Sequence, residues 1–465
     1  MGTQIVVNPV TRIEGHAKIV LDLDDQGQVE KGHLQVLEIR GFEKLLEGME
    51  LFKMPLITAR LCGVCPAAHH LASVAAIEAG LAVEAPRDAV LLRELLYAGH
   101  MLHSHALSCF VLSGPDVLLG IGADPKARNV FEIVRLDAET AKKVLRLRSI
   151  GQKTVEIVGG RGVHPVTVIP GGMASRPAAK EIETMAAWGE EALGLVAELG
   201  SVLRSRLALL AELRGDTPLS FPALAFSDKG THSYHKGDLV AKATTGEVRR
   251  FPVSAYHENL VEHVMPGSYM KSVRLRGAPE QSYFVGTLAR LLVNDRMPTP
   301  RADEALKAFK QRVGSAPSAV DYIEGRLVEL VGSAERMVQI TKQELGGGPT
   351  RVAVEPKEAR YVGGVEAPRG VLIHDYTTDR EGRITQANLI VATQNNYDAM
   401  DATVTHMARH FLPKGDDNAL MNGMEFGLRC FDPCLSCATH VAGRMPLEVE
   451  LRRGGEVSRT VTRRA

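Results

Sequence analysis

The chain has 465 residues, a formal net charge of zero and six cysteines. By length alone it could form about two or three domains, and the balanced charge argues against a nucleic-acid partner. The first residues lack the basic start, apolar stretch and cleavage site of a signal peptide, and no uncharged apolar run is long enough for a membrane span. So few cysteines in so long a chain favour metal or redox chemistry in a reducing compartment over a disulfide framework. We therefore expect a cytoplasmic protein.

The N-terminal region is predicted to begin with β-structure. Residues 17–23 and 33–39 alternate between apolar and polar side chains and flank a turn that ends in glycine, which predicts a β-hairpin. A short helix is expected over 42–51. A longer helix, rich in Ala and Leu, is predicted over 66–82 and begins directly after Cys65, where a helix N-terminus would stabilise a thiolate.

Helical segments dominate the middle of the chain. The apolar periodicity and the Gly and Pro stops predict five of them, at 86–112, 138–157, 177–214, 302–313 and 320–345. Residues 216–300 are punctuated by Gly and Pro and contain short strand-like pieces such as 248–253. Strands at 369–373 and 384–392 and a helix at 400–411 follow. The predicted fold class is α+β, predominantly α, with a core of long helices and small β-sheets at its edges.

Two CxxC pairs stand near opposite ends of the chain, in Arg60-Leu-Cys-Gly-Val-Cys-Pro and in Asp432-Pro-Cys-Leu-Ser-Cys-Ala-Thr-His440. One pair alone is compatible with zinc, an iron-sulfur cluster, thioredoxin-like redox chemistry or plain buried cysteine. Two pairs supply four sulfurs for a closed or bridged site of soft metals. A zinc ribbon would place its pairs within about 15–20 residues of each other. The wide separation here favours a site central to a large enzyme.

Both motifs resemble the signatures of the large subunit of nickel-iron hydrogenases. Similar motifs lie between and around them, namely Asn8-Pro-Val-Thr-Arg-Ile-Glu-Gly-His16, Arg40-Gly-Phe-Glu43, His103-Ser-His105 and Glu366-Ala-Pro-Arg-Gly370. The resemblance is strongest to the cytoplasmic branch, which includes NAD-linked bidirectional enzymes and subunits paired with heterodisulfide reductase. It implies the large-subunit hydrogenase fold, with residues 1–440 as a single catalytic domain.

The resemblance implies that Cys62, Cys65, Cys434 and Cys437 hold nickel. Cys65 and Cys437 would bridge to an iron that carries carbon monoxide and two cyanides, and Cys62 and Cys434 would be terminal ligands. Soft thiolates suit both metals, and bridging needs one sulfur from each pair. Such a centre splits H2 heterolytically, and we expect Cys434 to accept the proton.

Further roles follow from the same resemblance. Glu14 matches the proton-gate glutamate, and a carboxylate within reach of a thiol is suited to relay a proton. Arg369 matches the arginine over the open metal position, and Pro368 and Thr393 match residues around the diatomic ligands of the iron. Without the resemblance, Glu14 would be interpreted as a hairpin or surface charge and Arg369 as a salt-bridged loop arginine.

His69 lies four residues after Cys65 on the predicted helix and would hydrogen-bond its sulfur, although a lone histidine there is otherwise a core residue. Asp432 matches an acid that supports the metal site, with capping of a turn as the alternative. Glu43 and His440 match the ligands of a separate magnesium or iron near the C-terminus.

Two features depart from this pattern or extend it. Ser104 stands where many membrane-bound relatives have an aspartate, so the hydrogen bonding around the open metal position would differ. The chain also continues past His440. In the family a dedicated endopeptidase removes such a tail once nickel is in place, so 441–465 is interpreted as a propeptide. The alternative is an ordinary terminal strand, because 447–451 alternates well.

No cysteines remain for an iron-sulfur cluster, because Cys109 and Cys430 belong to no motif and are expected to be buried spectators. The clusters would therefore lie in a hydrogenase small subunit. Diaphorase-type or heterodisulfide-reductase-type subunits beyond it would pass electrons to NAD(P), ferredoxin or a heterodisulfide. One rival interpretation is a quinone-binding subunit of the complex I type, against which the four retained cysteines argue. The other is a zinc-stabilised structural protein.

Overall fold

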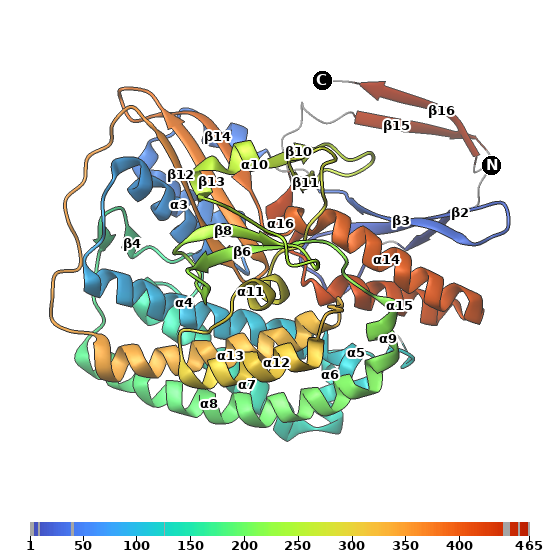
Figure 1. Ribbon diagram of the computed structural model, residues 1–465, viewed down its shortest axis with the longest axis horizontal. Helices are drawn as coiled ribbons and strands as arrows, with labels where there is room; N and C mark the ends of the chain where they lie inside the picture. The colour runs from blue at the N-terminus through green and yellow to red at the C-terminus, as the bar shows by residue number, and fades with distance from the viewer. Residues whose placement is uncertain are drawn as a thin grey trace.

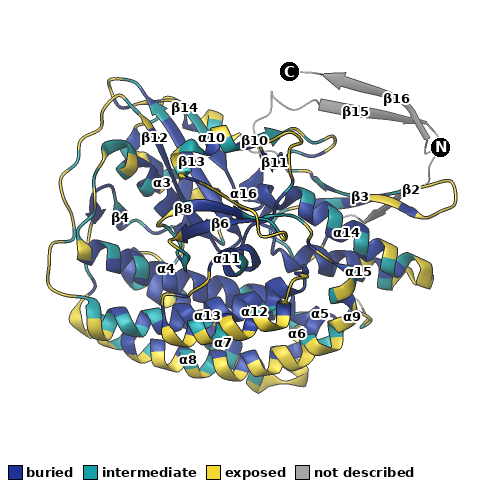
Figure 2. Ribbon diagram, viewed as in Figure 1, coloured by how far each residue is buried: buried dark blue, intermediate teal, exposed yellow. Residues whose placement is uncertain are grey.

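The computed structural model describes residues 4–7, 10–38, 41–124, 126–439, 447–453 and 456–463. Long helices form its lower half, as Figure 1 shows. The central helices of this layer are α4 (Arg87–Leu107) and α13 (Asp321–Gln339), which pack on α7 (Ala138–Gly159), α8 (Ala179–Leu207) and α12 (Pro300–Val313). Figure 2 shows α4 and α13 mostly buried, whereas α8 and α12 expose their outer sides.

Two glycines set the close approach of α4 and α7. A Cβ atom on Gly99 would lie 2.9 Å from the carbonyl oxygen of Gly151, and a Cβ on Gly151 would lie 2.5 Å from that of Gly99. No side chain fits at such distances, so the absence of a Cβ atom at both positions allows the two backbones to touch. This contact fixes the histidine-containing half of α4 against α7.

Small antiparallel sheets lie above the helices. The three-stranded sheets are β1-β2-β3 (Gln4–Val7, Ala17–Leu23, Val29–Val36) and β12-β13-β14 (Arg360–Ala367, Gly370–Thr378, Ile384–Ile390). A four-stranded sheet has the order β7-β6-β8-β9 (Thr231–His232, Ala223–Asp228, Asp238–Lys242, Val248–Phe251). Three hairpins complete the set, β4-β5 (Val168–Ile169, Gly172–Met173), β10-β11 (Leu260–His263, Ser272–Leu275) and β15-β16 (Leu447–Arg453, Glu456–Arg463).

The remaining helices connect these layers. They are α1 (Phe42–Leu46), α2 (Met54–Thr58), α3 (Pro66–Leu81), α5 (Gly114–Leu119), α6 (Val130–Leu136), α9 (Ala211–Asp216), α10 (Tyr256–Asn259), α11 (Thr287–Val293), α14 (Tyr397–Phe411), α15 (Asp417–Cys430) and α16 (Leu435–Ala438). The blue strands β2 and β3 lie beside the orange-red α14 in Figure 1, where the amide of Gly32 donates to Thr405 Oγ1 at 2.9 Å. Segments from both ends of the chain therefore share one core.

The predicted fold class is confirmed, and the long helices begin close to their predicted starts, whereas α8 ends at Leu207 and α13 at Gln339, before the predicted ends at 214 and 345. The helix predicted over 42–51 is wrong, because α1 ends at Leu46 and a separate helix, α2, begins at Met54. Residues 216–300 contain more regular structure than their Gly and Pro content indicated, including the four-stranded sheet and α11. The strand predicted from 369 begins at Gly370, because Arg369 lies in the tight turn between β12 and β13.

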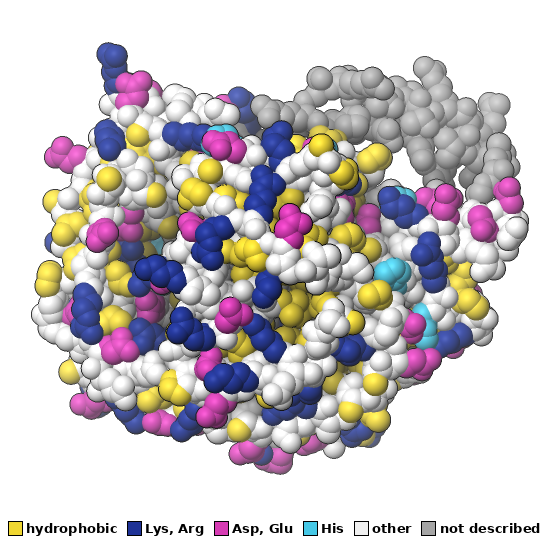
Figure 3. Space-filling view, viewed as in Figure 1, with side chains coloured by type: hydrophobic (Ala, Val, Ile, Leu, Met, Phe, Trp, Pro, Cys, Tyr) yellow, Lys and Arg dark blue, Asp and Glu magenta, His cyan; other side chains and the backbone are white. Residues whose placement is uncertain are grey.

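No helix among the described residues is long and apolar enough to cross a membrane. Lys and Arg side chains are interspersed with Asp and Glu over the face shown in Figure 3, so no field of a single sign covers this face. The described strands β15 and β16 pair with each other in an antiparallel hairpin. The interpretation of 441–465 as a propeptide stays a prediction, since His440 and 441–446 lie outside the described residues.

Candidate metal centre

The two CxxC pairs meet in the interior, as predicted. The four sulfurs lie within 4.8 Å of one another, and all four side chains are buried. Across the pairs, Cys62 Sγ lies 3.4 Å from Cys434 Sγ, and Cys65 Sγ lies 3.8 Å from Cys437 Sγ. In the part of the chain that the structure describes, no other group of three or more His, Cys, Asp and Glu side chains is close enough to share an ion.

The first pair is placed by the N-terminus of α3. Cys65 occupies the residue before this helix, so the turn that contains Cys62 is held against the helix start. The amides of Val64 and Cys65 donate to Cys62 Sγ, at 3.3 and 2.9 Å. Backbone donors aimed at a sulfur stabilise its thiolate form, which is the form that binds metals.

The second pair is held by residues far away in the sequence. The amide of Cys434 donates to Thr393 Oγ1 at 3.0 Å, and the amide of Leu435 donates to the carbonyl of Glu14 at 3.0 Å. Glu14 and Cys434 thus form a parallel β-bridge, which places the N-terminal segment directly beside the C-terminal cysteines. This bridge explains how both ends of the chain reach one site.

The electrostatics of the cluster favour stepwise ionisation. Hydrogen bonds from Cys434, Cys437 and Cys62, with a further one from His69, hold the pKa of Cys65 well below that of an ordinary thiol. The hydrogen bonds that Cys434 shares with the same sulfurs raise its own pKa well above that value. Of these two thiols, Cys65 therefore loses its proton more readily than Cys434.

Glu14 points at the cysteine that was expected to handle the proton. Its Oε2 accepts hydrogen bonds from Cys434 Sγ at 3.2 Å and from the amide of Ser436 at 3.0 Å. Ser436 Oγ donates to Glu38 Oε2 at 3.0 Å, and Glu38 bonds in turn to His16, whose side chain is 72% exposed. Glu14 therefore lies between a buried thiol and groups that reach the surface.

Arg369 occupies the tip of the β12–β13 hairpin and is 3% exposed. Its Nε donates to the carbonyl of Asp432 at 2.6 Å and its Nη2 to Asp432 Oδ1 at 3.0 Å, whereas its buried Nη1 has no hydrogen-bond partner among the described residues. Burial alone would lower the pKa of Arg369, but the charges of Asp432, Cys434, Cys65 and Cys62 raise it well above its usual value. A permanent positive charge thus faces the sulfur cluster.

The other predicted residues lie as follows. His69 Nδ1 is 3.2 Å from His374 Nε2, and the carbonyl of Pro368 accepts from Arg290 Nη2 at 3.2 Å. Glu43 lies in α1, but its predicted partner His440 is outside the described residues, so a second metal site stays a prediction. Ser104 Oγ is buried without a protein partner, and the cysteines outside the motifs are buried as expected, namely Cys109 and Cys430.

The sequence interpretation missed several partners of these residues. His374 Nδ1 lies 2.6 Å from the hydroxyl of Tyr376, which donates to Ser73 Oγ at 3.2 Å. The spacing of His374 and Tyr376 on one face of a strand was the only available signal for this chain of hydrogen bonds. Nothing in the sequence pointed to Arg290 or Glu329, which lie in no motif.

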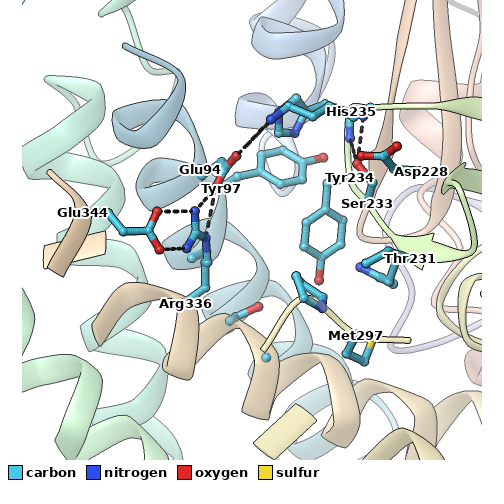
Figure 4. A pocket seen from close by; sticks show the side chains of 16 residues that line it. Glu94, Tyr97, Asp228, Thr231, Ser233, Tyr234, His235, Met297, Arg336 and Glu344 are labelled. Atoms are coloured by element: carbon cyan, nitrogen blue, oxygen red, sulfur yellow. Dashed lines mark hydrogen bonds and ion pairs between the residues drawn. The ribbon is translucent and has the colours of Figure 1, made fainter. Parts of the chain in front are cut away.

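A cavity of about 350 Å³ lies next to this region, between α4, α13 and the segment after β6. Figure 4 shows the rings of Tyr97 and Tyr234 together in the cavity, with Arg336 bonded to Glu94 and Glu344 at one side. The cavity has no cysteine among its lining residues. The sulfur cluster is therefore enclosed separately from it.

A family model described as "Nickel-dependent hydrogenase" matches residues 40–133 and 216–440, and a model described as "HoxH: HoxL-like" matches residues 4–39. The chain belongs to the nickel-dependent hydrogenase family. It is a catalytic large subunit of the nickel-iron type, an oxidoreductase acting on H2. The resemblance stated from the motifs is thereby confirmed over the two rival interpretations.

Relatives of this hydrogenase subunit include F420-non-reducing and NAD-reducing hydrogenases. It is 34% identical to a chain of the F420-non-reducing hydrogenase vhc of Methanococcus voltae, over 99% of this chain and 100% of the relative. It is also 34% identical to the NAD-reducing hydrogenase HoxS subunit beta of Cupriavidus necator, over 97% of each chain. The structure of an NAD+-reducing [NiFe]-hydrogenase in the H2-reduced state superposes with a TM-score of 0.90 and 34% identity, over 94% of this chain and 99% of that one.

The residues present fit a nickel-iron centre. Four buried sulfurs within 4.8 Å are a soft donor set of the kind that nickel and low-spin iron take. The partnerless Nη1 of Arg369, held in the interior beside the sulfur charges, is an orphaned donor that a group bound at the cluster would satisfy.

Proposed function

We propose that the four cysteines hold a nickel-iron centre at which this subunit splits and forms H2. Cys65 and Cys437 would be the sulfurs shared with an iron that carries carbon monoxide and cyanide, and Cys62 and Cys434 the sulfurs on nickel alone. The pairing across the two motifs, at 3.8 and 3.4 Å, supports this division. When bound, the centre would supply heterolytic cleavage of H2, which on complete oxidation yields two protons and two electrons.

The chain's own part in this reaction is to receive and remove the proton. Cys434 Sγ accepts it, and Glu14 Oε2 takes it on, because the two atoms are 3.2 Å apart and the cluster is buried. This contact is the observation on which the proposal depends most. The carboxylate is reached from solvent through the groups around Ser436, so the proton need not cross the apolar core.

The residues around the cysteines hold charge and orientation. Arg369 keeps a positive charge beside the sulfurs, and Asp432 orients its guanidinium through two hydrogen bonds. Thr393 fixes the backbone of Cys434, and His69 holds the sulfur of Cys65. Pro368 shapes the turn that carries Arg369.

Electrons leave through partner subunits in this proposal. A small subunit with an iron-sulfur cluster would take them to NAD(P) or ferredoxin, and the names of the NAD-reducing relatives support this branch. The alternative is the same chemistry coupled to a heterodisulfide reductase complex. We also retain the proposals of a cytoplasmic location, of an endopeptidase that removes 441–465, and of a magnesium or iron held by Glu43 and His440.

Metal analysis of the purified complex tests the centre. Nickel together with iron, the iron in excess because of the partner's cluster, and infrared bands of carbon monoxide and cyanide are expected, whereas zinc alone would refute the assignment. The proton route is tested by Glu14→Gln, which keeps the shape of the side chain but cannot accept a proton. Turnover per nickel should fall by about 10²–10⁴-fold. Glu14→Asp serves as the control that keeps a carboxylate, and equal losses in both variants would argue against relay.

A further inference from the structure

Arg290, in α11, is completely buried and uses all three guanidinium nitrogens. Its Nε and Nη2 bind the two carboxylate oxygens of Glu329 at 2.6 and 2.7 Å. Its Nη2 also donates to Thr287 Oγ1 at 3.0 Å, and its remaining hydrogen bonds go to three consecutive residues of another segment, at Glu366 Oε2 (2.9 Å), the carbonyl of Ala367 (2.9 Å) and the carbonyl of Pro368 (3.2 Å). The side chain of Arg290 therefore hydrogen-bonds to the backbone of the two residues immediately before Arg369.

Glu329, the carboxylate partner of Arg290, is itself held by several elements. Glu329, which is 0% exposed, also accepts from His105 at 2.8 Å, from Thr287 at 2.9 Å and from His232 at 3.1 Å. These partners come from α4, α11 and β7, so Glu329 cannot follow a movement of any one of them. A bidentate Arg–carboxylate pair of this kind has a defined geometry, which an ammonium group cannot reproduce.

Glu366 is held just as firmly. Its Oε1 accepts from the amide of Phe226 at 2.8 Å, its amide donates to the carbonyl of Tyr234 at 2.6 Å, and its carbonyl accepts from the hydroxyl of Tyr97 at 2.5 Å. The same two tyrosines line the cavity in Figure 4. Beyond Pro368, by contrast, the bonds that hold the guanidinium of Arg369 within the described part of the chain go to Asp432 alone.

We propose that Arg290 is a positioning residue for this hydrogenase, because it fixes the turn that aims the guanidinium of Arg369 at the sulfur cluster. The inference rests on the proposed function in assigning a catalytic benefit to that aim. Its geometric part, that Arg290 orders residues 366–370, is independent of metal and of turnover. A buried ion pair that served stability alone would not need to bond three successive residues of one turn.

The test compares Arg290→Lys with Arg93→Lys in the full chain. Arg93 is a matched control, because it is 9% exposed, binds Glu78 through two nitrogens at 2.7 and 2.8 Å, and bonds two carbonyls at 2.9 and 3.1 Å. In metal-free protein, hydrogen-deuterium exchange of amides 366–372 should be faster in Arg290→Lys and unchanged in Arg93→Lys. Unchanged exchange in Arg290→Lys, or equal effects of both variants, would overturn the geometric part.

A double-mutant cycle then tests the catalytic part on metal-loaded enzyme, with turnover expressed per nickel. Arg369→Lys should lower kcat by about 100-fold and Arg290→Lys by about tenfold. If Arg290 acts through Arg369, adding Arg290→Lys to Arg369→Lys should cause little further loss, whereas Arg93→Lys should have no effect in either background. Independent, multiplicative losses would refute the proposal.

Glu329→Gln provides a second variant should Arg290→Lys fail to fold. It keeps the side-chain volume and removes the charge that holds Arg290, so it should reproduce the faster exchange of 366–372. Firm exchange protection in this variant would also contradict the proposal. A chain that binds no nickel would refute the proposed function, but the exchange result on Arg290 could still be interpreted. Failure of the proposed function and failure of the Arg290 proposal are therefore distinguishable.

Discussion

Gly15 offers a sharp test of how the N-terminal segment meets the second cysteine pair. It has a φ of +86°, and a Cβ atom placed on it would lie 2.8 Å from Leu435 Cβ and 3.0 Å from the amide nitrogen of Ser436. Carbon atoms normally approach to about 3.5–4.0 Å, so Gly15→Ala must push the two segments apart by roughly 0.7–1.2 Å. The neighbouring contact between Glu14 Oε2 and Cys434 Sγ, now 3.2 Å, would lengthen beyond a hydrogen bond.

Two costs follow from this substitution. The left-handed backbone costs about 1–2 kcal/mol for any residue with a Cβ, and the overlap adds about 1–3 kcal/mol. A displacement near 1 Å between reacting groups lowers turnover by about 10²-fold. We therefore expect Gly15→Ala to lose roughly 2–5 kcal/mol of unfolding free energy and about two orders of magnitude in H2 oxidation per nickel.

Gly27→Ala is the matched control, because Gly27 has a φ of +75° in the turn between β2 and β3 and nothing lies within 4 Å of the place where its Cβ would stand. It carries the backbone cost alone. Urea unfolding and dye-linked H2 oxidation measure both variants. If Gly15→Ala behaved like Gly27→Ala in both assays, the close packing of the two chain ends would not matter and the reasoning would fail.

Three further substitutions test the surroundings. Thr393→Val leaves the buried amide of Cys434 without an acceptor and should cost about 1–3 kcal/mol of unfolding free energy, whereas Thr393→Ser should cost much less. Asp116→Asn removes the buried carboxylate that three arginines share, namely Arg12, Arg128 and Arg429, and should cost about 3–5 kcal/mol of unfolding free energy. The control Asp137→Asn, at an exposed helix cap, should cost less than about 1 kcal/mol. Burial raises the pKa of Glu366 to about 7 from an ordinary 4.5. The carboxyl group of Glu366 therefore binds a proton more tightly in the folded than in the unfolded chain, and the free energy of unfolding should fall as the pH rises from about 4.5 to about 7.

Each of these predictions has an outcome that contradicts it. Equal unfolding free energies for Thr393→Val and Thr393→Ser would show that the amide finds another partner. A loss in Asp116→Asn no larger than in Asp137→Asn would mean that the arginines are stable without their carboxylate. For Glu366, the unfolding midpoint of Glu366→Gln should no longer decline between about pH 5 and pH 7. A decline identical to that of the parent chain would assign the pH dependence to another group.

The shared site of the cysteine pairs could be predicted from the sequence because the CxxC spacing itself indicates metal binding. A CxxC turn followed by a helix presents two thiols on one side, and two such turns leave few arrangements other than a shared site. The contact between Glu14 and Cys434 was expected only through the family resemblance, since a lone glutamate near a hairpin carries no signal of its own. The geometry adds the reason, namely the β-bridge between these two residues.

The supporting residues could not be predicted in the same way. Arg290 lies in a region where Gly and Pro hide a short helix, and its partners outside that helix come from α13 and from the end of β12 with the turn after it. No spacing along the chain encodes such a meeting, because it depends on how α11 packs between α13 and the four-stranded sheet. The failed prediction of a helix over 42–51 has a local cause. Gly48 has a φ of +81°, a left-handed conformation typical just past the end of a helix, so α1 stops at Leu46.

The assembly of the sulfur cluster depends on contacts between the two ends of the chain. Two of the four sulfurs lie in the segment that follows α15. This part of the chain is bound to the N-terminal segment, because Arg429 Nε donates to the carbonyl of Thr11 at 2.9 Å and the amide of Thr11 donates to Glu425 Oε1 at 2.7 Å. The four-sulfur cluster can therefore form only when both ends have docked, and a metal that bridges the two pairs stabilises the same docking, because it binds the folded arrangement and not the separate halves.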